Sequence, residues 1–164
     1  GDGLSDGDFI GVKTGSSHLS EAYPDGDQGY RFQDPDGTLT LQLDTVDLTA
    51  FSTDSALKVS AAYYVNETTW ESSDAMRIWV EVDGGLELDM VNPLDVDDLT
   101  EGTFVDVDLS LTGYTTATFY ASLTSGASVE EMWVDHIRFT IPAPGSLMLL
   151  APGIGLIAGR RRSA

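Results

Sequence analysis

Apolar and polar residues alternate along most of the first 141 residues of the chain. Between residues 38 and 43, leucines take every second position, with threonine or glutamine between them. Because the side chains of a strand point alternately to its two faces, this period of two predicts a half-buried β-strand. We expect an additional strand in residues 16–23. The same alternation predicts strands in residues 9–12, 30–33, 57–65, 76–82, 105–111, 117–123 and 133–141.

Clusters of glycine, aspartate and proline separate these segments and predict turns at residues 24–29 and 34–37. Asp-Gly-Gly at residues 83–85 predicts a tight hairpin, because glycine tolerates a positive φ. Residues 49–55 and 93–99 are the segments where we expect single helical turns, and no longer helical period occurs before residue 142. The pattern predicts an all-β domain over residues 1–141, an antiparallel two-sheet jelly-roll sandwich.

The composition is strongly acidic. The chain carries 27 aspartates and glutamates against 8 lysines and arginines, a net charge of −19. Three of the basic residues lie in the tail, so residues 1–141 carry −22. Such a field repels phosphate backbones and anionic lipid headgroups, which argues against nucleic acid as a partner and against membrane binding by this domain. The absence of cysteine excludes disulfides and thiolate chemistry.

The tail, residues 142–164, has a different composition. Pro142, Ala143 and Pro144 are followed by an uncharged apolar run over residues 147–159 and then by a basic cluster, Arg160, Arg161 and Arg162. Prolines end the last strand, and arginines after an apolar run mark the side of a membrane that stays inside. The sequence therefore predicts a short C-terminal hydrophobic helix. Its 13 apolar residues are fewer than the roughly 20 that span a bilayer, so a disordered or surface-lying tail is the alternative.

This order of features resembles the PEP-CTERM sorting signal of Gram-negative bacteria. The tripeptide here has alanine where that signal has glutamate. The resemblance implies an exported protein that passes through an inner-membrane intermediate and reaches the cell surface or the extracellular space. It also implies an exosortase-like sorting protease as a partner. The sequence starts at Gly1 without an apolar leader, so we expect a trimmed form whose signal peptide is not included.

The body resembles galactose-binding-like jelly-roll modules in the sequence and order of three segments, residues 5–12, 73–85 and 130–139. In such modules the last strand often reads aspartate, any residue, isoleucine, arginine and an aromatic residue, as residues 135–139 do here. The resemblance implies the sandwich fold. It also implies a structural calcium, because many carbohydrate-binding members hold one where the first and last strands meet.

Candidate calcium ligands are Asp6, Asp8 and Asp135, because calcium takes six to eight hard oxygens. In a regular strand, Asp135 shares a face with the apolar residues that follow it at every second position and therefore points inward. An inward carboxylate must be paired or bound to a metal. The alternative is that Asp135 caps a turn or pairs with Arg138 or Arg77.

Aromatic residues form a second candidate site. Trp79 is opposite in parity to its apolar neighbours Ile78 and Val80, so it faces away from the core, and we expect Trp70 and Tyr120 to be exposed as well. Exposed aromatic rings can stack on the apolar faces of sugar rings. The alternative is that Trp79 packs under a loop or against the edge of the second sheet.

No catalytic motif accompanies these residues. His18 and His136 are the only histidines, and the sequence lacks nucleophile-elbow, zinc-protease and phosphate-loop patterns. We therefore expect a non-catalytic protein. Three hypotheses follow: a structural or interaction role linked to exopolysaccharide, a carbohydrate-binding module with a structural calcium, and a glycan-active hydrolase.

Overall fold

The computed structural model describes residues 8–15, 17–35, 37–92 and 96–140. Two short 3₁₀ turns, Thr49–Phe51 and Val96–Asp98, fall where single helical turns are expected. In the described part of the chain, the strands are β1 Phe9–Lys13, β2 Gly29–Gln33, β3 Thr38–Gln42, β4 Val46–Asp47, β5 Lys58–Val65, β6 Ala75–Val82, β7 Leu86–Val91, β8 Val105–Ser110, β9 Thr116–Thr124 and β10 Glu131–Thr140.

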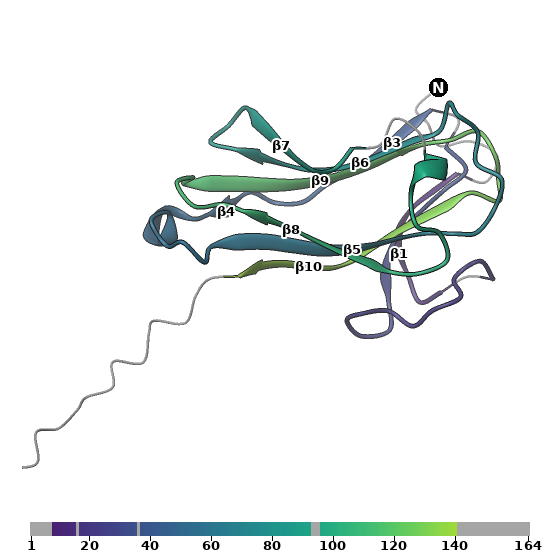
Figure 1. Cartoon of the computed structure of the whole chain (residues 1–164), viewed down its shortest axis with the longest axis horizontal. Helices are drawn as coiled ribbons and strands as arrows, with labels where there is room; N and C mark the ends of the chain where they lie inside the picture. The colour runs from purple at the N-terminus through teal and green to yellow at the C-terminus, as the bar shows by residue number, and fades with distance from the viewer. Residues whose placement is uncertain (1–7, 16, 36, 93–95, 141–164) are drawn as a thin grey trace, which may run out of the picture.

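The strands form two antiparallel sheets that face each other (Figure 1). Sheet A has the order β1-β2-β10-β5-β8, and sheet B the order β3-β9-β6-β7, with the short β4 pairing with β9. Neighbours in these sheets are mostly distant in sequence, and β10 lies between β2 and β5. The prediction of an all-β, antiparallel two-sheet sandwich is confirmed. The predicted tail and its helix lie outside the described residues.

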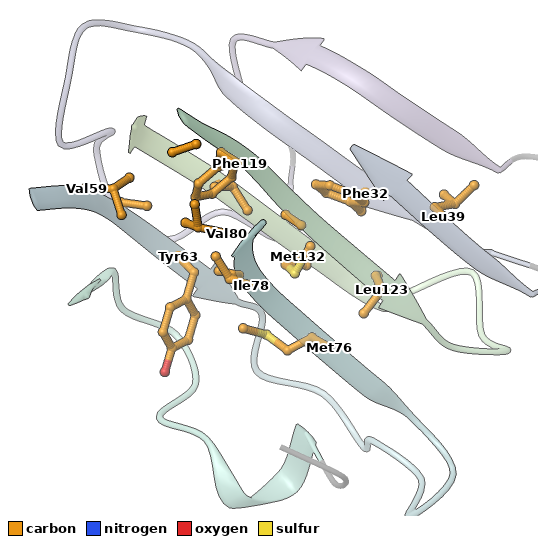
Figure 2. Packing of buried hydrophobic residues seen from close by; sticks show 14 of the residues in the cluster. Phe32, Leu39, Val59, Tyr63, Met76, Ile78, Val80, Phe119, Leu123 and Met132 are labelled. Atoms are coloured by element: carbon orange, nitrogen blue, oxygen red, sulfur yellow. The ribbon is translucent and has the colours of Figure 1, made fainter. Parts of the chain in front are cut away.

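The core lies between the sheets and is built by the predicted alternation. On β6, Met76, Ile78, Val80 and Val82 all point inward and are at most 1% exposed. Figure 2 shows side chains of both sheets meeting there, with Met132 of sheet A facing the same interior as Leu123 of sheet B. Burying one such side chain contributes about 1.5–3 kcal/mol.

A β-bulge in β10 changes which face its residues occupy. The register with β5 shifts between Asp135 and Arg138, and His136 adopts a positive φ of 54°. Before the bulge, Val134 points into the core and Asp135 points to the outer face. After it, Phe139 packs against the core. The expectation that Asp135 points inward is wrong, because one extra residue inverts the alternation.

The outer face of sheet A is covered by residues 17–28, which form no strand, so the strand expected in residues 16–23 is not formed in the described residues. The Tyr64 hydroxyl accepts a hydrogen bond from Ser20 N at 3.1 Å and donates one to the His18 carbonyl at 2.9 Å. Tyr23 packs edge-on against Trp133, with ring centroids 5.6 Å apart. The covering segment therefore buries Tyr64 and Trp133 on the face opposite the core.

Glu131 is the polar centre beneath this cover. It is fully buried and pairs with Arg31, and it lies 2.7 Å from His18 Nδ1. The indole of Trp133 donates a hydrogen bond to its second oxygen at 3.1 Å. These partners satisfy a charge that burial would otherwise make costly. The contact with His18 fastens the covering segment to sheet A.

The hairpin between β6 and β7 forms as predicted at residues 83–85. Gly84 has a φ of 75°, and Asp83 also has a positive φ, of 50°. The Asp83 carboxylate accepts hydrogen bonds from the backbone N–H groups of Thr115 and Thr116, at 2.8 and 3.2 Å. The hairpin is thereby tied to the neighbouring strand β9. Among the described residues, none forms a helix that has the length and apolar character to cross a membrane.

Candidate functional site

The outer face of sheet B presents polar and aromatic side chains that alternate with the core residues. Trp79 on β6 lies opposite Tyr120 on the central strand β9 and opposite Asp89 on β7. Tyr120 in turn lies opposite Gln42 of β3, so one row of facing residues crosses the sheet. We call this surface the sheet B face and define it by Gln42, Arg77, Trp79, Glu81, Glu87, Asp89, Tyr120 and Ser122.

An aromatic stack lies at the centre of the sheet B face. The rings of Trp79 and Tyr120 are nearly parallel, at 7°, with centroids 5.0 Å apart. The guanidinium carbon of Arg77 lies 4.6 Å from the centroid of the Trp79 ring, which is a cation–π contact. Both rings are half-buried. Trp79 is therefore held by neighbours on two strands rather than free to change rotamer.

Two acids of β7 fix the arginine in turn. Arg77 Nη1 is 2.7 Å from Glu87 Oε2, and its Nη2 is 2.7 Å from Asp89 Oδ1. Such exposed pairs contribute little to stability, about 0.2–1 kcal/mol. Their effect is to orient the guanidinium over the indole.

Hydrogen-bonding groups are thus held next to an apolar ring surface. Burial, together with the charges of Glu81 and Glu87, raises the pKa of Tyr120 above its ordinary value. Its hydroxyl is therefore protonated and can donate a hydrogen bond at neutral pH, as that of an ordinary tyrosine can. Arginine supplies donors and the acids supply acceptors. A ligand with apolar C–H faces and many hydroxyl groups matches this combination.

The predicted aromatic residues separate into two groups. Trp79 faces outward, as its parity predicts, and Tyr120 lies beside it. Trp70 is only 2% exposed, belongs to the core cluster, and donates its indole N–H to the Asn66 carbonyl at 3.1 Å. The expectation that Trp70 is exposed is wrong, because its loop folds inward and satisfies the indole internally.

The predicted calcium ligands are not gathered by the described strands. Asp8 directly precedes Phe9, which lies opposite Gln33, whereas Asp135 follows Val134, which lies opposite Tyr30 nearer the other end of β2. Asp8 and Asp135 therefore lie several residues apart along the direction of β2, at about 3.3 Å for each residue. Asp6 lies outside the described residues. Calcium at these three positions stays a prediction.

Asp135 itself is 9% exposed and borders a cavity of about 310 Å³. Its Oδ2 accepts a hydrogen bond from Asp25 N at 3.0 Å, which fits the alternative that Asp135 caps a turn. Arg138 binds the Asp25 carboxylate, at 3.0 Å. The bulge and the turn are thus joined by one network.

Sequence reasoning missed two features that depend on strand pairing. One is the environment of Glu131, because no local pattern shows that Arg31 and His18 converge on it. The other is a group of carboxylates in two loops, Glu71, Asp74 and Glu130, whose oxygens lie within 4.8 Å of one another. Both were visible in the sequence only as acids among many others.

No protein-family model and no curated protein matches the chain. Its fold is that of the β-sandwich found in carbohydrate-binding modules. One such structure, from work on the promiscuous specificity of carbohydrate-binding modules of the β-sandwich superfamily, has a TM-score of 0.51 at 12% identity. The match covers 85% of this chain and 59% of that one, so this chain spans less than two thirds of that neighbour.

Two further neighbours are more distant. A family 61 carbohydrate-binding module in complex with β-1,4-galactotriose has a TM-score of 0.46 at 11% identity, covering 81% of this chain and 82% of that one. The C-terminal family 22 carbohydrate-binding module of Clostridium thermocellum Xyn10B has a TM-score of 0.45 at 8% identity, covering 82% of each chain. The likeness to the first neighbour, at 12% identity, shows the fold and not the ligand.

Proposed function

We propose that this domain is a non-catalytic carbohydrate-binding module and that the sheet B face binds neutral glycans. The observation that carries the proposal is the stack of Trp79 and Tyr120, with Arg77 held against the indole by two acids. Sugar rings have apolar C–H faces that pack on aromatic surfaces and hydroxyl groups that need fixed partners. The fold likeness to a carbohydrate-binding module agrees with this use, as an analogy of fold.

The charge of the surface favours neutral sugars over acidic ones. Glu81, Glu87 and Asp89 lie on the same face as the stack, and only Arg77 among the defining residues is basic. The acid excess of the whole chain adds to this local field. A uronate or sulfate group would meet repulsion here, whereas neutral hexose units would not.

The decisive experiment compares binding of soluble neutral polysaccharides by the wild-type protein and by Trp79→Ala. Affinity electrophoresis and calorimetry with β-glucans, galactans and xylans would identify the ligand. Removing the indole takes away the packing surface, so we expect at least about tenfold weaker binding. The free energy of unfolding should change by less than about 1.5 kcal/mol, because Trp79 lies outside the core.

Phe9→Ala is the matched control. Phe9 is also a half-buried aromatic residue in contact with an arginine, but it lies on β1 of sheet A. Its truncation should leave glycan binding unchanged. If both variants bind as the wild type does, the sheet B face is not the binding site. If no glycan binds the wild-type protein, the carbohydrate-binding proposal fails as a whole.

The export hypothesis rests on residues 142–164, which lie outside the described residues, and it stays a prediction. A module carried to the cell surface would be well placed to hold exopolysaccharide, so the two ideas are compatible. Intact-mass spectrometry of the protein recovered from its producing cells tests the sorting signal. We expect a C-terminus close to Pro142–Pro144. A mature protein that still contains Arg160, Arg161 and Arg162 would contradict cleavage there.

A further inference from the structure

Three carboxylates meet at the end of the sandwich where β6 begins and β9 ends. Glu71 and Asp74 lie in the loop before β6, and Glu130 directly precedes β10. One oxygen from each lies within 4.8 Å of the others. Asp74 is 3% exposed and Glu130 is fully buried, whereas Glu71 is exposed. Two of the three acids are thus held where water does not reach them freely.

Each buried carboxylate uses one oxygen to close its own turn. Asp74 Oδ2 accepts a hydrogen bond from Glu71 N at 2.6 Å, and Glu130 Oε2 accepts one from Ala127 N at 3.2 Å. The other oxygen of Glu130, Oε1, is buried and accepts no hydrogen bond from the described residues. A buried carboxylate oxygen left in this state is costly unless a ligand satisfies it.

A hydroxyl group beside Glu130 gives a second indication. Ser125 is 7% exposed, and its Oγ is buried without a hydrogen-bond partner in the described part of the chain. Ser125 lies close enough to Glu130 to lower its pKa, yet the contact lacks the geometry of a hydrogen bond. Together with Glu71 and Asp74, Ser125 lines a cavity of about 320 Å³. The unsatisfied hydroxyl therefore adjoins this cavity, and the Glu130 carboxylate lies beside two of its lining residues, Glu71 and Asp74.

The electrostatics agree with this geometry. Burial, and next the charge of Asp74, raises the pKa of Glu130 to about 7. Burial also raises the pKa of Asp74. Acids crowded in this way repel one another when ionised, and a bound cation would remove the repulsion.

We propose that Glu71, Asp74 and Glu130, together with the Ser125 hydroxyl, form a calcium-binding site. The donors are all oxygen, which suits hard cations rather than zinc or copper. Oxygens on opposite sides of calcium are about 4.6–5.2 Å apart, given its bond lengths, whereas those on opposite sides of magnesium are about 4.0–4.2 Å apart. Oxygens within 4.8 Å of one another can share one ion, and calcium accepts an irregular set of ligands more readily than octahedral magnesium does.

An ion at this position would join the two sheets. Asp74 leads into β6 and Ser125 follows β9, both in sheet B, whereas Glu130 leads into β10 of sheet A. The site would therefore stabilise the sandwich at one end. It differs from the predicted site at Asp135, and it does not depend on the proposal that the sheet B face binds glycans.

The test is calcium titration of the full chain after removal of divalent ions with chelator, followed by calorimetry and thermal unfolding. We expect calcium to bind more tightly than magnesium. At a calcium concentration about 100 times the Kd, the melting temperature should rise by roughly 5–10 °C. Glu130→Gln and Glu71→Gln should each weaken binding by at least about tenfold, because ligand charge sets calcium affinity.

Asp135→Asn is the matched control and should keep this binding. Since Glu130 is buried, Glu130→Gln could fail to fold, in which case the exposed Glu71→Gln decides. The proposal is overturned if the wild-type protein binds no calcium or prefers magnesium. It is also overturned if binding survives both glutamine variants or is lost only in Asp135→Asn.

Discussion

At the scale of single residues, Asp83 shows how one side chain can make stability depend on pH. Its carboxylate accepts hydrogen bonds from the backbone and then the hydroxyl of Thr115, both at 2.8 Å, and these hold the pKa of Asp83 below its usual value. A lowered pKa in the folded state means that the unfolded chain binds the proton more tightly. The stabilisation is therefore present above about pH 4 and is lost as the pH falls through the folded-state pKa.

We predict that Asp83→Asn is less stable than the wild type at pH 7 and that the difference shrinks as the pH is lowered towards 2.5. Asparagine tolerates the positive φ of this position, so the turn itself should survive. Urea unfolding at the two pH values measures the effect. Asp106→Asn, at an exposed position of β8, provides the comparison. A difference for Asp83→Asn that is the same at both pH values would contradict the prediction.

For a single residue, its alternation with apolar neighbours in a strand predicts which face its side chain points to, but not which side chains it contacts. The outward direction of Trp79 follows from Ile78 and Val80, and it is confirmed. No such neighbours define the direction of Trp70, which lies in a loop and enters the core. The stacking of Trp79 on Tyr120 also needs the pairing of β6 with β9, which the sequence does not contain.

At the scale of elements, the bulge in β10 decides which side chains face the core. Its residue His136 has a positive φ, a conformation that costs a residue with a side chain on the order of 1 kcal/mol or more and a β-branched residue the most. Asn adopts this conformation more readily, and glycine does so without steric cost. His136 therefore allows the bulge to be tested by substitution.

We predict that His136→Val is less stable than His136→Gly by about 1–2 kcal/mol, with His136→Asn close to the wild type. The order should appear in the midpoints of urea unfolding with unchanged slopes. In a regular strand the order would reverse, since valine favours strands and glycine disfavours them. Equal or higher stability of the valine variant would thus contradict the bulge.

The bulge also explains why the alternation predicts the position of β10 but not the faces to which all of its side chains point. Alternation located β10 correctly, but a strict period of two cannot contain an inserted residue. For the same reason the alternation predicts an inward direction for Asp135, although its side chain lies on the outer face near Asp25. The segment of residues 17–28 has no regular period, and its position over sheet A depends on contacts such as that of Ser20 with Tyr64.

At the scale of the whole molecule, the class of fold could be predicted, but the order of the strands could not. Alternating strands with Gly and Asp turns are enough to indicate a two-sheet sandwich. The position of β10 between β2 and β5 is set by long-range pairing and by the packing of both faces of sheet A. The carboxylates of Glu71, Asp74 and Glu130 come together only because that order brings the loop before β6 close to the start of β10.

The charge of the molecule leads to a prediction about which glycans it can bind. With a net charge of −19, the protein repels polyanions over a Debye length of about 30 Å at 10 mM salt, but of only about 8 Å at 150 mM. Binding of a neutral glycan depends on stacking and short hydrogen bonds, so its Kd should change by less than about twofold between these salt concentrations. Affinity electrophoresis at both ionic strengths measures this.

A polyuronate of similar length provides the opposing case. We expect the polyuronate not to bind at 10 mM salt. Any binding should appear only at 150 mM salt, where screening weakens the repulsion by Glu81, Glu87 and Asp89. Tighter binding of the polyuronate at low salt would mean that Arg77 attracts the ligand's charge despite its two acidic partners. In that case the acids of β7 would be displaceable, and the sheet B face would select acidic rather than neutral sugars.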